Sequence, residues 1–166
     1  MSSGKGLALL ALLVGISGLG LGVYTVVFPK VETIFGIQNT WFNYDSTGLG
    51  YATSPPGADI VIDALTINFT VNSGESVYFL FNTFAIITVG SPGIIQINFF
   101  LDGVKKEPPT YPEMIFGSDG TQYGSVTLQV AKVISAGFHN LTVVIAGTDA
   151  SNGIKDCTLL VQTFIP

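Results

Sequence analysis

The stretch "LTINFTVN", residues 65–72, decides the fold class of this chain of 166 residues. Apolar residues occupy every second position, at Leu65, Ile67, Phe69 and Val71, and polar residues fill the positions between them. Successive side chains of a β-strand point to opposite faces of its sheet. This alternation therefore predicts a strand with one buried and one solvated face.

Similar apolar runs recur along the chain, separated by turn-forming segments such as "NSGE" at 72–75 and "SDG" at 118–120. Further strands are predicted at residues 37–44, 76–89, 94–102, 124–134, 139–147 and 157–165. The segment "KKEPPTYPE" at 105–113 is predicted as a loop, because proline cannot donate a hydrogen bond within a central strand. Short strands joined by short turns predict an antiparallel sandwich or barrel.

The N-terminal segment has a different pattern and predicts a hydrophobic helix over residues 1–28. The run from Leu7 to Phe28 is uncharged and reaches the length of about 20 apolar residues that spans a bilayer. Small residues recur at steps of three and four, which places them on one helical stripe: Ala8, Ala11, Gly15, Gly18 and Gly22. We expect this stripe to pack against another helix. The alternative is a lone anchor in which glycine is only tolerated.

Four segments stand out in the C-terminal part: "LTINFTVNSGESVYFLF", "IQINFFLDG", "VISAGFHNLTVVIAG" and "LLVQTFI". Together they resemble the C1q/TNF-like jelly roll, in which a strand ending in Asp-Gly precedes a long loop and a similar SAG turn opens the penultimate strand. The resemblance covers roughly residues 59–166. It implies a two-sheet sandwich of a kind that commonly assembles into trimers.

The pair "KG" at Lys5 and Gly6, directly before the apolar run, resembles the processing site of archaeal type IV pilin-like proteins. This resemblance implies N-terminal helices bundled into a filament core, with β-rich domains outside. The predicted fold is thus mainly β, an antiparallel jelly-roll-like β sandwich preceded by one long N-terminal hydrophobic α-helix. Residues 1–28 would be the helix, as membrane anchor or filament core, 29–58 a linker with the first strand, and 59–166 the sandwich domain.

The composition limits the partners of the protein. Charged residues make up 10% of the chain, against about 25% in typical soluble domains, and the net charge is −5. A surface with so few charges predicts cover by neighbouring subunits or glycans. The acidic balance and the absence of arginine argue against a nucleic-acid partner.

The predicted strands at 76–89 and 157–165 are apolar on both faces, which a sheet with one solvated face does not require. One of these faces is therefore expected to meet another subunit, since interfaces favour aromatic residues. The residues expected there are Tyr78, Leu80, Phe84 and Phe164. The alternative is that loops within residues 105–123 fold over this face.

Two Asn-x-Thr motifs predict glycosylation, at Asn68 and Asn140. Both asparagines fall on the polar phase of their predicted strands, so they are expected to face solvent. Glycans there would cover part of the charge-poor surface.

Catalytic chemistry finds little support. The single histidine, His139, and the single cysteine, Cys157, cannot by themselves build a tetrahedral zinc site. We expect the histidine to pack or hydrogen-bond at a strand end and the cysteine to be a small buried residue. Calcium needs about 6–8 converging oxygens, whereas the carboxylates are scattered over the loops, at Asp102, Glu107, Glu113, Asp119, Asp149 and Asp156. We therefore expect no enzymatic activity, no cofactor and no metal.

These patterns favour a structural, self-assembling cell-surface protein, a pilus-like filament subunit with a helical core and exposed β domains. The expected partners are other copies of the chain, a membrane through the N-terminal helix, and glycans. The alternatives are a membrane-anchored trimeric ligand-binding module of the C1q/TNF type and a viral envelope or capsid jelly roll.

Overall fold

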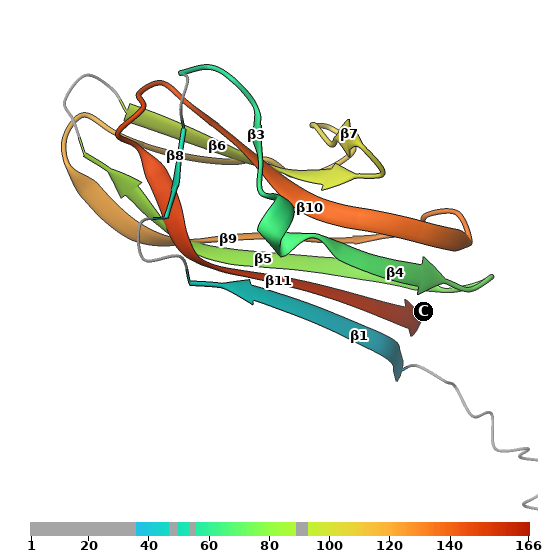
Figure 1. The fold of residues 1–166 in the computed structure, drawn as a ribbon. Coiled ribbons are helices and arrows are strands. Elements are labelled where there is room, and N and C mark those ends of the chain that lie inside the picture. Colours follow the sequence, from blue (N-terminus) through green and yellow to red (C-terminus); the bar gives the residue numbers. More distant parts are fainter. Residues whose placement is uncertain (1–35, 47–49, 54–55, 89–92) are drawn as a thin grey trace, which may run out of the picture. The chain divides into compact units, whose positions relative to one another are not determined.

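Antiparallel strands dominate the part of the chain that the structure, a computed structural model, describes: residues 36–46, 50–53, 56–88 and 93–166. The strands form two sheets, which face each other as the layers of a β-sandwich (Figure 1). The one helical element in these described residues is a short 3-10 helix at Asp63–Leu65.

Sheet A has the strand order β1-β11-β5-β9, and sheet B has the order β3-β10-β6-β7, with β4 also on β10 and β8 also on β6. The strands of sheet A are β1 (Gly36–Asp45), β5 (Ser76–Ile87), β9 (Gln122–Lys132) and β11 (Gly153–Ile165), and the short β2 (Tyr51–Ala52) pairs with β11. The strands of sheet B are β3 (Ile60–Val61), β4 (Ile67–Val71), β6 (Gly93–Leu101), β7 (Val104–Lys105), β8 (Met114–Ser118) and β10 (Gly137–Gly147). Each strand range predicted from the sequence overlaps one of these strands.

Neighbouring strands within each sheet come from distant parts of the chain. The first strand, β1, pairs with the last, β11, and β4 pairs with β10. Along the chain the longer strands cross repeatedly from one sheet to the other. Figure 1 accordingly shows blue β1 beside red β11.

The alternation seen in the sequence fills the space between the sheets. In β4, Ile67, Phe69 and Val71 are buried, whereas Asn68 and Thr70 are exposed. This burial pattern confirms the strand predicted from "LTINFTVN".

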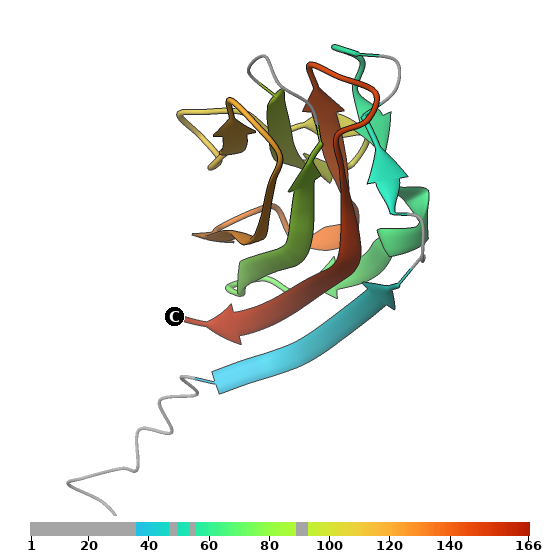
Figure 2. The same cartoon turned by 90° about the vertical axis from the view of Figure 1, so that its left-hand side faces the viewer.

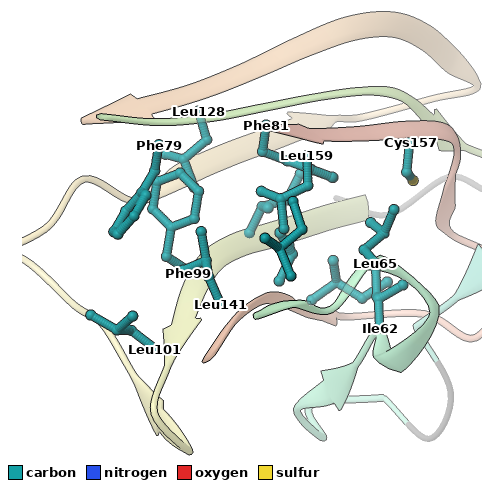
Figure 3. Close-up of a cluster of buried hydrophobic side chains, with 14 of the residues drawn as sticks. Ile62, Leu65, Phe79, Phe81, Phe99, Leu101, Leu128, Leu141, Cys157 and Leu159 are labelled. Atoms are coloured by element: carbon teal, nitrogen blue, oxygen red, sulfur yellow. The ribbon is translucent and has the colours of Figure 1, made fainter. Parts of the chain in front are cut away.

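Phenylalanines from both sheets meet in the core. The ring centroids of Phe69 and Phe79 are 5.8 Å apart, and those of Phe79 and Phe99 are 5.6 Å apart. Figure 3 shows Phe79 and Phe99 side by side, with Leu128 and Leu141 nearby. Because Phe79 belongs to sheet A and the other two rings to sheet B, these contacts hold the two layers together.

The Asp-Gly pair at the end of β6 forms the two-residue hairpin turn to β7. Asp102 has φ +54° and Gly103 has φ +75°. Two successive positive φ angles define a type I′ turn, whose twist matches that of antiparallel strands. Glycine has no Cβ to clash in this conformation and aspartate tolerates it, so the backbone geometry selects this dipeptide.

The predicted fold class is wrong in its long N-terminal helix, because the described residues contain no α-helix. No helix in that part of the chain has the length and apolarity needed to cross a membrane. The predicted packing stripe lies outside the described residues: Ala8, Ala11, Gly15, Gly18 and Gly22. Apolar length alone does not specify a helix, since each interior glycine costs about 1 kcal/mol relative to alanine.

The described sandwich forms a compact unit, Gly36–Pro166. Its first strand, β1, is an edge strand of sheet A and contributes to the same core. The segment predicted as a linker with the first strand, residues 29–58, therefore supplies β1 and β2 to the sandwich.

Removing the ring of Phe79 should destabilise the sandwich strongly. Phe79 is fully buried, and Phe→Ala changes in protein cores cost about 3–5 kcal/mol. The free energy of unfolding of Phe79→Ala can be measured by urea denaturation. Phe138→Ala is the matched control, because Phe138 is 71% exposed, and it should change stability by less than about 0.5 kcal/mol. Equal losses in the two variants would contradict the core assignment.

Candidate functional site

Large apolar side chains gather on the outer face of sheet A. The register places Phe42 of β1 beside Leu160 of β11, and Leu160 beside Leu80 of β5. We call these three residues the apolar row. Ile37 and Phe164 form a second apolar pair two rows further along the sheet.

The outer face of sheet A is open in the described part of the chain. Phe42 is 62% exposed and Ile37 59%, while Leu80 and Leu160 are half-buried. In neither Figure 1 nor Figure 2 does a described element lie over this face. Large exposed apolar patches mark interaction sites, so this face is a candidate for one.

The residues predicted for a subunit contact all lie on this face: Tyr78, Leu80, Phe84 and Phe164. The loop proposed as an alternative cover is positioned elsewhere. Its Tyr111 inserts into the core, and the following strand β8 joins sheet B. The contact with another subunit stays a prediction.

Phe42 lies in the predicted strand 37–44, but the sequence alone does not predict it as a residue of the subunit contact. Within that segment the inward positions are only half-buried, including Trp41 and Asn43, so the alternation is weak. Only the pairing of β1 with β11 shows that Phe42 extends the apolar row.

A groove of about 320 Å³ lies beside the apolar row on the same face. Its lining includes Asn82, Phe84, Ser125, Thr127, Asp156 and Thr158. The register between β11 and β5 shifts between Lys155 and Thr158, and Asp156 has φ +51°. This is a β-bulge, which inserts an unpaired residue and bends the strand. The groove thus lies where β11 departs from regular pairing.

A buried histidine joins three segments near the turn between β6 and β7. The Nδ1 atom of His139 is 2.8 Å from Oδ2 of Asp102, and its Nε2 atom is 2.8 Å from the carbonyl oxygen of Ser135. The backbone N–H of Asn140 donates to Oδ1 of Asp102 at 2.9 Å. Both ring nitrogens face acceptors, so the doubly protonated ring satisfies both, whereas a neutral ring satisfies only one.

This geometry shifts the pKa of both partners. Burial by itself lowers the pKa of His139, but the hydrogen bonds to Asp102 and Ser135 and the charge of Asp102 raise it above its usual 6.5. Burial by itself raises the pKa of Asp102, but the hydrogen bonds from His139 and from the Asn140 backbone lower it below 3.8. At a pH between the pKa of Asp102 and the pKa of His139, the two side chains form an ion pair.

The remaining candidates for metal binding or nucleophilic chemistry do not form a site in the described part of the chain. Among the described residues, no group of three or more His, Cys, Asp or Glu side chains could hold a metal ion. Cys157 is fully buried, and its Sγ lies 3.3 Å from Oγ1 of Thr83. Burial raises the pKa of this thiol to about 11, which makes it a poor nucleophile near neutral pH.

The two predicted glycosylation sites form a direct cross-strand pair. Asn68 of β4 lies opposite Asn140 of β10, and Nδ2 of Asn140 donates to Oδ1 of Asn68 at 2.9 Å. Their side chains lie on the outer face of sheet B, since the neighbouring positions in β4 point into the core. Glycosylation itself stays a prediction.

The chain matches no protein-family model and shows no significant similarity to a curated protein. Membership of the C1q/TNF-like or the archaeal pilin-like proteins is therefore a wrong prediction, and the pilin-like helix is missing from the described residues. The motifs behind the first resemblance have local causes. "LDG" forms the type I′ turn, and Gly137 of "SAG" has φ +141°, a conformation that favours glycine. Turns of unrelated antiparallel sandwiches demand the same residues.

The stability of the sandwich should be greatest in mildly acid solution and decrease as the pH rises. The pKa of His139 is raised on folding, so its contribution is complete below pH 6.5 and is lost as the pH rises through the folded-state pKa. The pKa of Asp102 is lowered, so its contribution is complete above pH 3.8 and is lost as the pH falls through the folded-state pKa. The midpoint temperature of thermal unfolding, measured from acid to alkaline pH, checks this dependence.

Asp102→Asn tests the assignment, because it keeps the shape of the side chain and removes its charge. His139 is the only histidine of the chain, so the decrease on the alkaline side should shrink in this variant. Identical pH profiles for the variant and the wild type would contradict the role of the pair.

Glycosylation should occur at Asn68 or Asn140 in the host organism, with one glycan on each chain. Both side chains face outward, but Nδ2 of Asn140 lies only 2.9 Å from Oδ1 of Asn68. A glycan on one asparagine would therefore crowd the other. Intact-mass analysis of natively produced protein, with Asn68→Gln and Asn140→Gln variants, distinguishes the sites. The bare polypeptide mass would refute glycosylation, and a mass with two glycans would refute mutual exclusion.

Proposed function

We propose that the protein is a non-enzymatic structural protein of the cell surface, whose copies associate through the outer face of sheet A. The observation that carries this proposal is the apolar row, Phe42, Leu160 and Leu80, which crosses three adjacent strands. Burial of apolar surface is the main favourable term in most protein association.

The surroundings of the apolar row favour burial as well. The rows of side chains on either side of it carry no charge: Thr40, Gln162 and Tyr78 on one side, and Tyr44, Thr158 and Asn82 on the other. Interface cores are depleted of charged residues, because each would have to lose its hydration. The face can therefore be covered without a charged side chain being desolvated at its centre.

A second copy of the chain is the partner that this face suits best. A twofold axis brings the same patch of two subunits together, so that an apolar row meets an apolar row. The flanking hydroxyl and amide groups of Thr40, Gln162 and Tyr78 donate and accept hydrogen bonds, which lets them pair with the same groups of the other copy.

A location at the cell surface is supported by the opposite side of the sandwich. Asn68 and Asn140 lie on the outer face of sheet B, where glycans would leave the face of sheet A uncovered. A chain with only 10% charged residues would gain solubility from such glycans.

Leu160→Lys should weaken self-association of the full chain by at least about tenfold, because an unpaired charge at the centre of a buried interface costs more than about 1.4 kcal/mol. Static light scattering over a range of protein concentrations measures the change in mass. The wild type should form oligomers at concentrations where the variant is monomeric.

Thr70→Lys is the matched control, since it adds the same charge at an exposed position on sheet B. It should leave the oligomeric mass unchanged, and circular dichroism should show that both variants are folded. An unchanged mass for Leu160→Lys would overturn the proposed interface. Equal dissociation of both variants would also overturn it, because the effect would then reflect net charge.

A further inference from the structure

The groove on sheet A differs in chemistry from the apolar row beside it. Its volume of about 320 Å³ falls within the range of about 300–1,000 Å³ that is usual for small-molecule sites. Phe84 is the aromatic residue among those that line the groove. The ring of Phe84 is nearly parallel to that of Tyr123, with centroids 6.3 Å apart and an interplanar angle of 19°.

Most of the other lining residues carry hydrogen-bonding groups, and Val126 is the apolar one among them. Oγ1 of Thr127 donates to Oδ1 of Asn82 at 2.6 Å, which orients that amide. Among the described residues the NH2 group of Asn82 has no acceptor. Asp156, at the bulge, adds an exposed carboxylate. Lys155 is not a lining residue, but its Nζ lies over the ring of Phe84, 5.4 Å from the ring centroid.

We propose that this groove binds a neutral sugar ring. A sugar presents an apolar C–H face, which packs on an aromatic ring, and hydroxyl groups that both donate and accept hydrogen bonds. Nζ of Lys155 lies over the ring of Phe84, so the ring supplies the aromatic contact when the sugar displaces this ammonium. The NH2 group of Asn82 donates to a sugar oxygen. The carboxylate of Asp156 accepts from neighbouring hydroxyl groups, in bonds strengthened by its charge. Phe84, expected from the sequence to contact a subunit, is thereby assigned to a ligand site.

Other ligand classes suit the groove less well. The charge among the lining residues is the carboxylate of Asp156, whereas Lys155 is not a lining residue, so phosphate and other anions would meet a negative charge in the groove. One carboxylate is also too few for calcium, which takes about 6–8 oxygen ligands. An extended peptide adds to a free sheet edge through backbone hydrogen bonds. The floor of the groove includes β5, which lies between β11 and β9 and is paired on both sides, so recognition here depends on side chains.

This site goes beyond the proposed self-association and can be tested separately from it. Leu80 and Leu160 of the apolar row are absent from the groove lining, and Asn82 and Thr158 of the adjacent row belong to it. A substitution at Phe84 or Asp156 therefore changes the groove without changing the apolar row.

The test is titration of the isotopically labelled full chain with glucose, galactose, mannose and N-acetylglucosamine, followed by backbone amide chemical shifts. At least one sugar should bind saturably with millimolar affinity and shift the amides of Asn82, Phe84 and Thr127. Phe84→Ala and Asp156→Asn should each weaken binding by about tenfold, as the loss of one buried contact or one charge-assisted hydrogen bond predicts. Phe42→Ala, on the same face but outside the groove, should bind like the wild type.

Three outcomes would overturn the proposal. The first is that none of the four sugars causes saturable shifts in the groove, and the second is that Phe84→Ala and Asp156→Asn bind the sugar as tightly as the wild type does. The third is that Phe84→Ala dissociates oligomers while no sugar binds, which would assign Phe84 to a subunit contact instead. The apolar row is tested independently by the light scattering of Leu160→Lys, so failure of one proposal leaves the other distinguishable.

Discussion

The insertion of β11 between β1 and β5 is the constraint on which the rest of the structure depends. The last strand of the sandwich pairs with the first along one edge and with β5 along the other. Its inward side chains Ile154, Leu159 and Val161 are fully buried, and each such burial contributes about 1.5–3 kcal/mol. The entropy lost in joining distant segments grows only slowly with their separation. Burial along β11 therefore outweighs the cost of bringing the chain ends together.

The same strand shapes both surfaces for which a function is proposed. Its outward residue Leu160 joins Phe42 to Leu80 across sheet A, and its bulge at Asp156 opens the groove a few residues away. The regular part of β11 thus supports the apolar row, and the irregular part supports the polar groove. One sheet face can in this way carry a contact between copies of the chain and a site for a small ligand.

Polar contacts at the ends and outer faces of the sandwich connect segments that the core alone does not fix. His139 and Asp102 link the start of β10 to the turn after β6, and the ring of His139 lies 5.6 Å from that of Phe69. Asp102 has two roles, since it adopts the positive φ of the turn and accepts hydrogen bonds from His139 and the backbone of Asn140. A local turn preference and a long-range ion pair therefore depend on one residue.

The sequence by itself determined the local features of this protein. Strand character along residues 65–72, the Asp-Gly turn and the hydrogen-bonding role expected of His139 were all predictable, because each depends on a few adjacent residues and on general stereochemistry. The apolar length of the N-terminal segment predicted a long helix, and the described residues contain no α-helix. A count of apolar residues does not contain the tertiary contacts on which most helical stability depends.

Only the tertiary structure decided which segments meet. Asn68 lies beside Asn140, Asp102 beside His139 and Phe42 beside Leu160, although these pairs are far apart in the sequence. Backbone hydrogen bonds between strands are nearly independent of sequence, so many pairings and registers satisfy the same alternation. The observed one follows from the simultaneous packing of both sheets around a shared core, which no single segment encodes.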